Sequence, residues 1–386
     1  MSGPLEGLRV IEMAGIGPAP FCAMLLADMG AEVVRIDRQE AIDLGLPGRN
    51  DRKYEVLLRG RRSLSVDLKS KAGRDVVLRM VNRADVLIEG FRPGVMERLG
   101  LGPDVCLQLN PRLVFGRMTG FGQEGPLAAA AGHDINYIAL TGALAAIGPK
   151  DGKPVPPLNL VGDFGGGAMF LAFGVLAALH EARHSGRGQV VDAAMVDGAA
   201  YLTAMFYGLT AAGTWREARA DNALDGGAPW YDTYATKDGG WMSVGAIEGR
   251  FYAEMIERLG LKDAGLPAQH DRAGWPVLRQ LLADTFASRT RSEWEAVFKD
   301  SDACVVPVLG LGEAAGHPYN TVRGVFVTRD GVPQPAPAPR FSRTVPVAGA
   351  APGPVGADTD AVLADWGLPV AEIAALKRQG VVGTKG

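Results

Sequence analysis

A strand, helix, strand pattern near the start of the chain is the feature that most constrains its fold. Leu8 to Met13 is a short apolar run, Phe21 to Met29 has helical spacing, and residues 31–36 are β-branched and apolar. Strands and helices that alternate across short loops give right-handed crossovers and a parallel sheet covered on both faces. The first half is therefore predicted to be α/β. Its further expected elements are strands at 64–68, 85–88, 113–117 and 189–193, and helices at 73–82, 165–181 and 195–209.

A change in character near residue 225 predicts a smaller α+β domain. Tyr231 to Tyr234 and Trp241 to Gly245 flank the turn 237–240, which indicates a β-hairpin. The proline-rich stretch Val332 to Arg340 predicts an extended linker, since proline fits neither a helix interior nor a central strand. Amphipathic helices are expected at 250–259, 275–287 and 291–298, and a last helical segment near 358–366.

These elements place a large domain at residues 1–200, completed by 335–386 after the linker, and a small domain at 225–330.

Charge, cysteines and apolar runs restrict the partners and the compartment. The formal net charge of −3 predicts no general attraction to nucleic acid or to an anionic membrane. Cys22, Cys106 and Cys304 are widely separated, which fits a reducing compartment and predicts a cytoplasmic protein. The most apolar run, Ala168 to Leu179, is about half the length of a membrane span. We therefore expect a buried helix and no membrane insertion.

Two motifs imitate known ligand sites but depart from them. Gly15-x-Gly17-x-x-Pro20, with Asp37 after the next strand, resembles a dinucleotide fingerprint, but a proline replaces its third glycine. A tight turn before a helix is the better interpretation. His180 to His184 matches the zinc pattern H-E-x-x-H, but it occupies the last turn of a predicted helix and no third ligand follows. A solvated helix end is expected there, and we predict no metal and no separate cofactor.

His133 and Asp163 are the candidates for acid/base chemistry. His133 lies in a polar cluster after Gly132, and a histidine pKa near about 6.5 suits proton transfer, although a lone histidine is usually structural. Asp163 has a simple interpretation as a helix N-cap. The three glycines at 165–167 suggest instead a helix start with exposed N–H groups that could hold an anion.

Long motifs give the chain a resemblance to a known family. These are LRVIEMAGIGPAP, AEVVRIDR, ADVLIEGFRPGVMERLGLGP, GHDINY, PVPPLNLVGDFGGGAMF, GQVVDAAMVDG, LDGGAPWYDTY, VGAIE and APRFSR, and they span nearly the whole chain. On these residues the chain resembles the α-methylacyl-CoA racemases of the class III CoA-transferase (CaiB/BaiF) family. The resemblance implies a Rossmann-like large domain, a small domain and an interlocked homodimer, with active sites between the large domain of one subunit and the small domain of the other.

The resemblance also implies roles for particular residues. His133, oriented by Glu248, and Asp163, assisted by Asn159, would be the two acid/base groups. Coenzyme A, part of the substrate, would be bound by Arg38, Val66, Asp67, Leu68, Lys69, Gly90, Phe91, Arg92, Arg98, Gly132, Asp134, Ile135, Asn136 and Tyr137. The basic segment 41–62 is longer than the family pattern leads us to expect.

The implied reaction is the interconversion of (2R)- and (2S)-2-methylacyl-CoA thioesters in lipid or fatty acid metabolism. One group removes the α-proton and the other delivers a proton to the opposite face, and N–H groups of Gly165 to Gly167 are expected to stabilise the enolate oxygen. The main alternative is a CoA-transferase, in which Asp163 would attack the thioester. A nucleotide-dependent oxidoreductase, a zinc hydrolase and a non-catalytic CoA-binding protein are more distant alternatives.

Overall fold

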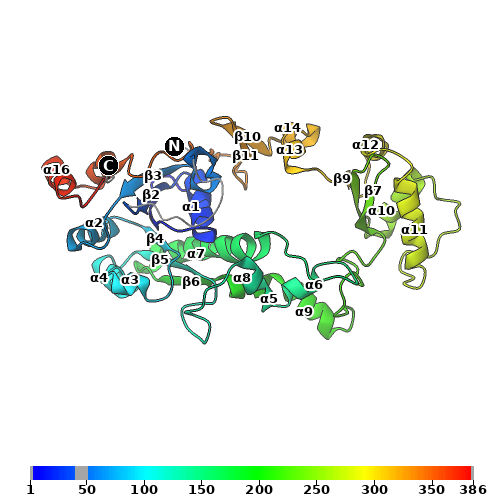
Figure 1. Cartoon of the computed structure of the whole chain (residues 1–386), viewed down its shortest axis with the longest axis horizontal. Helices are drawn as coiled ribbons and strands as arrows, with labels where there is room; N and C mark the ends of the chain where they lie inside the picture. Colours follow the sequence, from blue (N-terminus) through cyan, green and yellow to red (C-terminus); the bar gives the residue numbers. More distant parts are fainter. Residues whose placement is uncertain (1–2, 40–50, 384–386) are drawn as a thin grey trace. The chain divides into compact units, whose positions relative to one another are not determined.

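Six parallel strands form the central sheet of the molecule (Figure 1). They are β1 (Arg9–Met13), β2 (Glu32–Asp37), β3 (Arg61–Ser65), β4 (Val86–Glu89), β5 (Val114–Thr119) and β6 (Val190–Ala194). The order is β3-β2-β1-β4-β5-β6, and each neighbouring pair is parallel. This is the Rossmann order, in which the direction of winding reverses between β1 and β4. The predicted α/β fold is confirmed.

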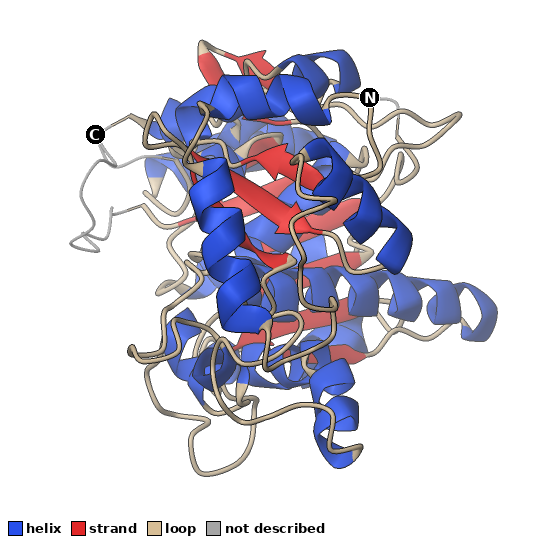
Figure 2. Ribbon diagram, turned by 90° about the vertical axis from the view of Figure 1, so that its right-hand side faces the viewer, coloured by secondary structure: helices blue, strands red, loops and turns tan. Residues whose placement is uncertain are grey.

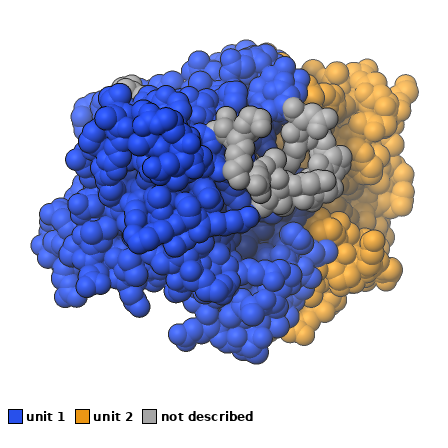
Figure 3. All heavy atoms as spheres, turned by 60° about the vertical axis from the view of Figure 1, so that its left-hand side comes forward, with its two compact units in different colours: residues 1–141, 158–202, 318–386 blue, residues 142–157, 203–317 orange. Residues whose placement is uncertain are grey.

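The computed structural model describes residues 3–39 and 51–383, and the chain divides into two compact units (Figure 3). Unit 1 comprises residues 1–141, 158–202 and 318–386, and unit 2 comprises residues 142–157 and 203–317. These boundaries differ from the expected ones, since the second unit begins before 225 and takes in 142–157. Arg219 accounts for part of this, because its guanidinium donates to the carbonyls of Ala145 and Gly152, at 3.2 and 2.5 Å.

Both faces of the sheet in unit 1 are covered by helices (Figure 2). Alternate residues of β1 point to opposite faces, so that Val10 and Ile11 belong to different core clusters. One cluster packs α1 (Pro18–Asp28) and α7 (Met169–Ser185) on the sheet. The other packs α2 (Lys71–Val81), α15 (Thr359–Asp365) and α16 (Val370–Arg378), of which α16 follows the segment expected near 358–366.

The long helix begins earlier than the sequence suggested. A π-helical stretch, Leu160–Ala168, leads directly into α7, so that residues 165–167 lie inside the helix and not at its start. The continuous stretch Leu160–Ser185 is long and apolar enough, by length and composition, to cross a membrane, and 39% of its most apolar window is buried. The apolar run expected from the sequence, Ala168 to Leu179, is therefore shorter than the apolar helical stretch in the structure. A helix that covers a sheet in a protein core can be equally long and apolar. Leu171 and Val175 of this stretch lie over Gly116 of β5.

The C-terminal part of unit 1 closes one edge of the sheet. The predicted linker is in part a strand, because β11 (Val332–Pro335) pairs antiparallel with β10 (Phe326–Arg329). The side chain of Gln334 is buried and accepts a hydrogen bond from Arg59 at 2.8 Å. Val382, which follows α16, forms a β-bridge with Val66. The remaining helices of unit 1 are α3 (Val95–Arg98), α4 (Pro103–Leu109), α5 (Asp134–Ala139), α8 (Met195–Leu202) and α14 (Pro318–Arg323), with 3-10 turns at Arg52–Tyr54 and Val56–Leu58.

Unit 2 contains the predicted hairpin within a three-stranded antiparallel sheet. The order is β7 (Tyr231–Ala235), β8 (Trp241–Gly245) and β9 (Val305–Pro307). Its core packs helices at the three positions where amphipathic patterns were found. They are α10 (Gly249–Arg258), α11 (Trp275–Phe286) and α12 (Arg291–Phe298), and shorter helices are α6 (Ala143–Ala146), α9 (Ala204–Ala211) and α13 (Leu311–Ala314).

Candidate active site

Asp163 lies in the first turns of the π-helical stretch and contacts two other elements of unit 1. Its backbone N–H donates to Oδ2 of Asp134 in α5, at 2.7 Å, and its own Oδ2 accepts from Nδ2 of Asn159, at 3.1 Å. A Cβ built on Gly17, before α1, would lie 3.5 Å from the same Oδ2. The carboxylate therefore lies between helix starts and is hydrogen-bonded by Asn159, whose predicted assisting role stays a prediction.

The surroundings of Asp163 favour its protonated form. Burial raises the pKa of Asp163, the hydrogen bond from Asn159 lowers it, the charge of Asp134 raises it and that of His133 lowers it. The net result is a pKa above the ordinary value. The charge of His133 acts on Asp163 from the residue before α5, and the shared acid/base role of the two residues stays a prediction. A carboxyl group with a raised pKa is a candidate for general acid/base catalysis.

His133 is the residue before α5, with an extended backbone and an exposed side chain. Its backbone N–H donates to Oδ1 of Asn136 at 3.0 Å, and its carbonyl accepts from the N–H of Asn136 at 2.8 Å. The start of α5 is thus held by the GHDINY motif itself. Tyr137 anchors the motif, because its ring is buried and its hydroxyl donates to the carbonyl of Gly132. Burial raises the pKa of Tyr137 to about 12, so the hydroxyl stays protonated as this donor.

The glycines after Asp163 serve close packing of helices. A Cβ on Gly166 would lie 2.5 Å from the amide nitrogen of Ala199, and one on Gly198 would lie 1.8 Å from the carbonyl oxygen of Gly166. The π-helical stretch and α8 therefore meet backbone to backbone. The prediction of exposed N–H groups at 165–167 is wrong, because these residues lie within the helix and Gly166 and Gly167 are buried.

The expected CoA ligands gather at the carboxyl end of the parallel sheet. Arg38 follows β2, Val66 follows β3 and Gly90 follows β4, beside the reversal of winding between β1 and β4. Open α/β sheets bind ligands at this position. The guanidinium of Arg38 lies over the ring of Phe91, 5.8 Å from its centroid. Exposed groups at this edge include Arg38, Arg92 and Arg98, whereas Val66, Asp134 and Tyr137 are buried.

Glu248 belongs to unit 2, where it is the residue before α10 and is exposed. Its pairing with His133 stays a prediction. Of the basic segment 41–62, residues 41–50 lie outside the described part of the chain. Arg52 pairs with Asp37 and Glu55, at 3.8 and 3.6 Å.

Both imitated ligand motifs lie at helix ends. His180 and His184 lie in the last turns of α7, where Nδ1 of His184 is 2.8 Å from the carbonyl of His180. Among the described residues, no group of three or more His, Cys, Asp or Glu side chains is arranged to hold a metal ion. Gly17 precedes α1 with φ of 68°, and Pro18 occupies the first helical position. The fingerprint-like segment is therefore a tight turn before a helix.

Buried charges in the sheet are a feature that the sequence analysis missed. Glu12, in the middle of β1, is fully buried and is bonded by Arg35 of β2 and Arg61 of β3. The available signal was a glutamate and an arginine in strands predicted to be covered on both faces, since buried charges occur only in pairs.

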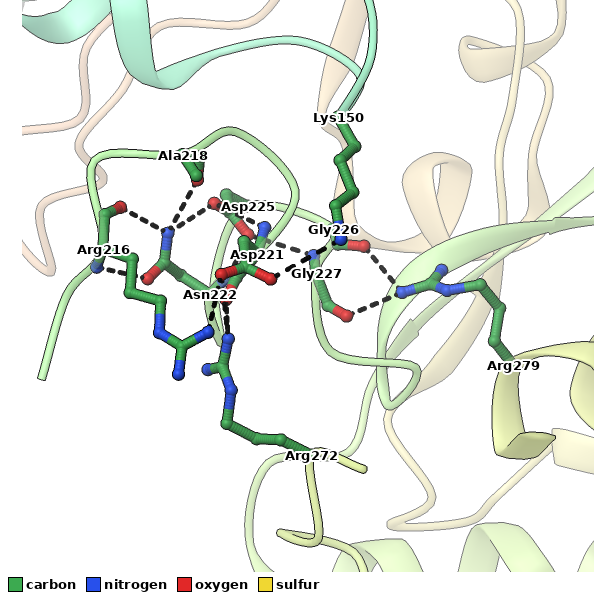
Figure 4. Close-up of polar contacts among 10 residues, drawn as sticks. All are labelled: Lys150, Arg216, Ala218, Asp221, Asn222, Asp225, Gly226, Gly227, Arg272 and Arg279. Carbon is green, nitrogen blue, oxygen red and sulfur yellow. Dashed lines mark hydrogen bonds and ion pairs between the residues drawn. The ribbon is translucent and has the colours of Figure 1, made fainter. Parts of the chain in front are cut away.

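A cavity of about 860 Å³ in unit 2 is lined by several charged side chains (Figure 4). Asp221 accepts a hydrogen bond from Arg216 and forms an ion pair with Arg272, both at 3.1 Å. It forms a longer ion pair with Lys150, at 3.9 Å. Arg279 donates to the carbonyls of Gly226 and Gly227, at 2.8 Å each. These contacts join the loop 216–227 to α11 and to the 148–152 turn, so the charges are explained by the structure of the loop.

Comparison with known proteins gives several matches that cover most of this chain. The model of CoA-transferase family III matches residues 5–359. An α-methylacyl-CoA racemase of Mus musculus is 49% identical over 98% of this chain and 97% of that protein, and one of Homo sapiens is 44% identical over the same shares. A crystal structure of a CaiB/BaiF family protein from Brucella suis has a TM-score of 0.81 at 23% identity, covering 95% of this chain and 100% of that one.

Proposed function

The chain belongs to CoA-transferase family III, and on that premise we propose that it is an isomerase with α-methylacyl-CoA racemase activity. It interconverts (2R)- and (2S)-2-methylacyl-CoA thioesters by proton transfer through an enolate. The observation that carries this proposal is the Asp163 carboxyl group, whose pKa is raised by burial and which interacts electrostatically with His133. Two different titratable groups in one site are what inversion by proton exchange requires, because the proton leaves one face and returns to the other.

In this mechanism His133 and Asp163 exchange roles with the enantiomer that is bound. When one accepts the α-proton, the other donates to the opposite face of the planar enolate. Glu248 of the partner subunit would orient the imidazole and stabilise its cationic form. Asn159, which already donates to Asp163, favours the ionised carboxylate and so helps it to act as the base.

The enolate oxygen needs hydrogen-bond donors. We assign this role to the first-turn N–H groups of α5, at Asp134 and Ile135, in place of those at 165–167. The first N–H groups of a helix have no acceptor within the helix, and these two directly follow His133 in the chain. Donors aimed at a developing oxyanion are each worth about 3–4 kcal/mol of transition-state stabilisation.

Coenzyme A would lie along the carboxyl ends of β2, β3 and β4. Arg38, Arg92 and Arg98 supply exposed guanidinium groups, which bind phosphates by charge-assisted bonds. The loop Val66 to Lys69 is held in place, because the N–H of Asp67 donates to the carbonyl of Val381 at 2.9 Å.

A homodimer, interlocked as in the family, is part of the proposal. Its support in unit 1 is an exposed apolar row on one face of α7, formed by Met169, Phe173 and Leu176, which are 51%, 73% and 42% exposed. Large exposed apolar patches mark interaction surfaces. We propose that this row contacts a second copy of the chain and not lipid, and that the protein is cytoplasmic, in keeping with its three free cysteines.

The decisive experiment follows exchange and stereochemistry together. One enantiomer of a 2-methylacyl-CoA is incubated with the protein in heavy water, and α-deuterium incorporation and epimerisation are measured. A racemase incorporates α-deuterium and epimerises the substrate at matching rates. Trapping with hydroxylamine distinguishes the alternative CoA-transferase, in which Asp163 would form an acyl intermediate and pass CoA to another carboxylate. A hydroxamate at Asp163 formed on turnover, without epimerisation, would overturn the racemase assignment.

A further inference from the structure

Two buried arginines bind one buried carboxylate inside the sheet of unit 1. Nη1 of Arg35 donates to Oε1 of Glu12 at 2.5 Å, and Nε of Arg61 donates to Oε2 at 3.0 Å. Glu12 is 0% exposed, and the two arginines are 7% and 9% exposed. Both carboxylate oxygens are therefore used, and the two guanidinium groups are fixed relative to β1. Desolvation of three charges is costly, so the arrangement is not explained by stability alone.

One further arm of each arginine reaches the same turn, while Nε of Arg35 donates to Asp37 and Nη1 of Arg61 to the carbonyl of Arg59. Nη2 of Arg35 donates to the carbonyl of Gly15 at 3.1 Å, and Nη2 of Arg61 donates to the carbonyl of Pro20. These carbonyls stand at the two ends of the 15–20 turn, which connects β1 to the start of α1. Glu12 thus holds both ends of the turn through two rigid, planar side chains.

The held turn lies against Asp163. A Cβ on Gly17 would be 3.5 Å from Oδ2 of Asp163, and the ring of Phe21 stacks on that of Phe164 with centroids 4.6 Å apart. Pro18 and Pro20 have no N–H, so this helix start offers the carboxylate fewer donors than most helix starts do. The turn therefore covers Asp163 without hydrogen-bonding it strongly.

We propose that Glu12, Arg35 and Arg61 are positioning residues that fix the 15–20 turn against Asp163 and keep water from its carboxylate. The role of Asp163 in proton transfer rests on the proposed function. The other groups that face Asp163 are Asn159 beside it and, around α5, His133, Asp134 and Tyr137. None of these contacts Glu12 in the described structure.

The test compares a buried carboxylate of β1, whose arginines reach the start of α1, with a buried carboxylate at the last residue of α1. Glu12→Gln keeps the shape of the side chain and removes the charge that aligns the two arginines. The matched control is Asp28→Asn, at the other end of α1, where a carboxylate that is 2% exposed is bonded by Arg59. We expect Glu12→Gln to lower kcat for exchange by about tenfold to a hundredfold, the range for displaced catalytic groups, with KM changed less than about twofold. Asp28→Asn should lower the unfolding temperature and leave kcat unchanged.

A second measurement does not depend on turnover. The pKa of Asp163 is followed by carboxyl ¹³C NMR, with its signal assigned from an Asp163→Asn spectrum. Because burial raises this pKa, access of water in Glu12→Gln should lower it, and in Asp28→Asn it should stay at the wild-type value. If the wild-type protein lacks exchange activity, the proposed function fails while this measurement still tests the positioning role.

Gly17→Ala provides the test if Glu12→Gln does not fold. It leaves the buried charges in place and strains the turn directly, since Gly17 has φ of 68°. The same fall in kcat and in the pKa of Asp163 is expected. An unchanged pKa of Asp163 in both the Glu12 and Gly17 variants, or an equal loss of kcat in Asp28→Asn, would overturn the proposal.

Discussion

The carboxylate of Asp134 accepts the backbone N–H of Asp163 at 2.7 Å and, by its charge, raises the pKa of the Asp163 side chain. One residue of α5 therefore both holds the second acid/base group in place and shifts its titration. In the proposed mechanism, two residues next to each other in the sequence, His133 and Asp134, would therefore serve one proton transfer in different ways.

We expect Asp134→Asn to move the acidic limb of the pH–rate profile to lower pH. The amide oxygen can still accept the N–H of Asp163, but the negative charge that raises the pKa of Asp163 is gone. The profile is measured for the enantiomer whose α-proton Asp163 removes, since activity then rises as Asp163 ionises. Asp75→Asn in α2, which removes an exposed carboxylate paired with Lys71, is the control and should leave the limb in place.

Asp163→Asn should make the protein more stable at neutral pH but not in acid. The folded state raises the pKa of Asp163, so it binds the proton more tightly than the unfolded chain does. The stabilisation that the protonated Asp163 carboxyl group contributes is fully present below the pKa of this group in the unfolded chain. It is lost as the pH rises through the pKa of Asp163 in the folded protein. Thermal unfolding of both proteins at pH 4 and pH 7 checks this, and equal differences at the two values would contradict it.

His133→Asn should abolish inversion while leaving exchange at one face. Asp163 can still remove and return the proton of the enantiomer that faces it, so α-deuterium enters that enantiomer with retention. The other enantiomer should not exchange. Acyl-CoA binding, measured by calorimetry, should stay within about twofold, because uniform binding does not depend on the group that acts in the transition state. Loss of both exchange and binding would indicate a structural histidine.

Gly198→Ala should destabilise the protein by at least about 1–3 kcal/mol, the usual cost of overpacking, because its Cβ would lie 1.8 Å from the carbonyl oxygen of Gly166. Gly208→Ala in α9 is a matched control, since a Cβ there meets nothing within 4 Å. Alanine in an open helical position should stabilise by about 0.4–1 kcal/mol. Urea denaturation of the two variants distinguishes these outcomes.

Arg38→Ala should raise KM for acyl-CoA about tenfold, with little change in kcat, since a phosphate contact contributes equally to ground and transition states. Arg112→Ala is the control, because Arg112 is also exposed but precedes β5, at the amino end of the sheet. A higher salt concentration should narrow the difference between wild type and Arg38→Ala. Equal KM values for the two variants would exclude Arg38 from the CoA site.

The strands could be predicted closely because buried parallel strands are continuous apolar runs. The strand predicted at Leu8 to Met13 is β1, at Arg9–Met13, and the strand predicted at residues 31–36 is β2, at Glu32–Asp37. The start of the long helix could not be predicted, because it depends on a contact with a residue far away in the sequence. The N–H of Asp163 finds its acceptor in Asp134, 29 residues earlier, which lets the helix begin at Leu160.

The Glu12 network was also beyond the local pattern. Its members come from three strands, and a charge in an apolar run indicates that it is paired but not which residues are its partners. His133 and Asp163 could be proposed as candidates because their neighbours, unlike those of Glu12, form conspicuous polar and glycine motifs.

The β-bridge between Val66 and Val382 has a consequence for the order in which the protein matures. Val66 precedes Val382 by more than 300 positions in the chain, so translation delivers β3 long before its pairing partner. We therefore expect a chain truncated before residue 381 to bind CoA poorly even when the sheet has formed, because the loop from Val66 to Lys69 then lacks this support. The proposed nucleotide site would be completed only after the segment around Val381 has been synthesised.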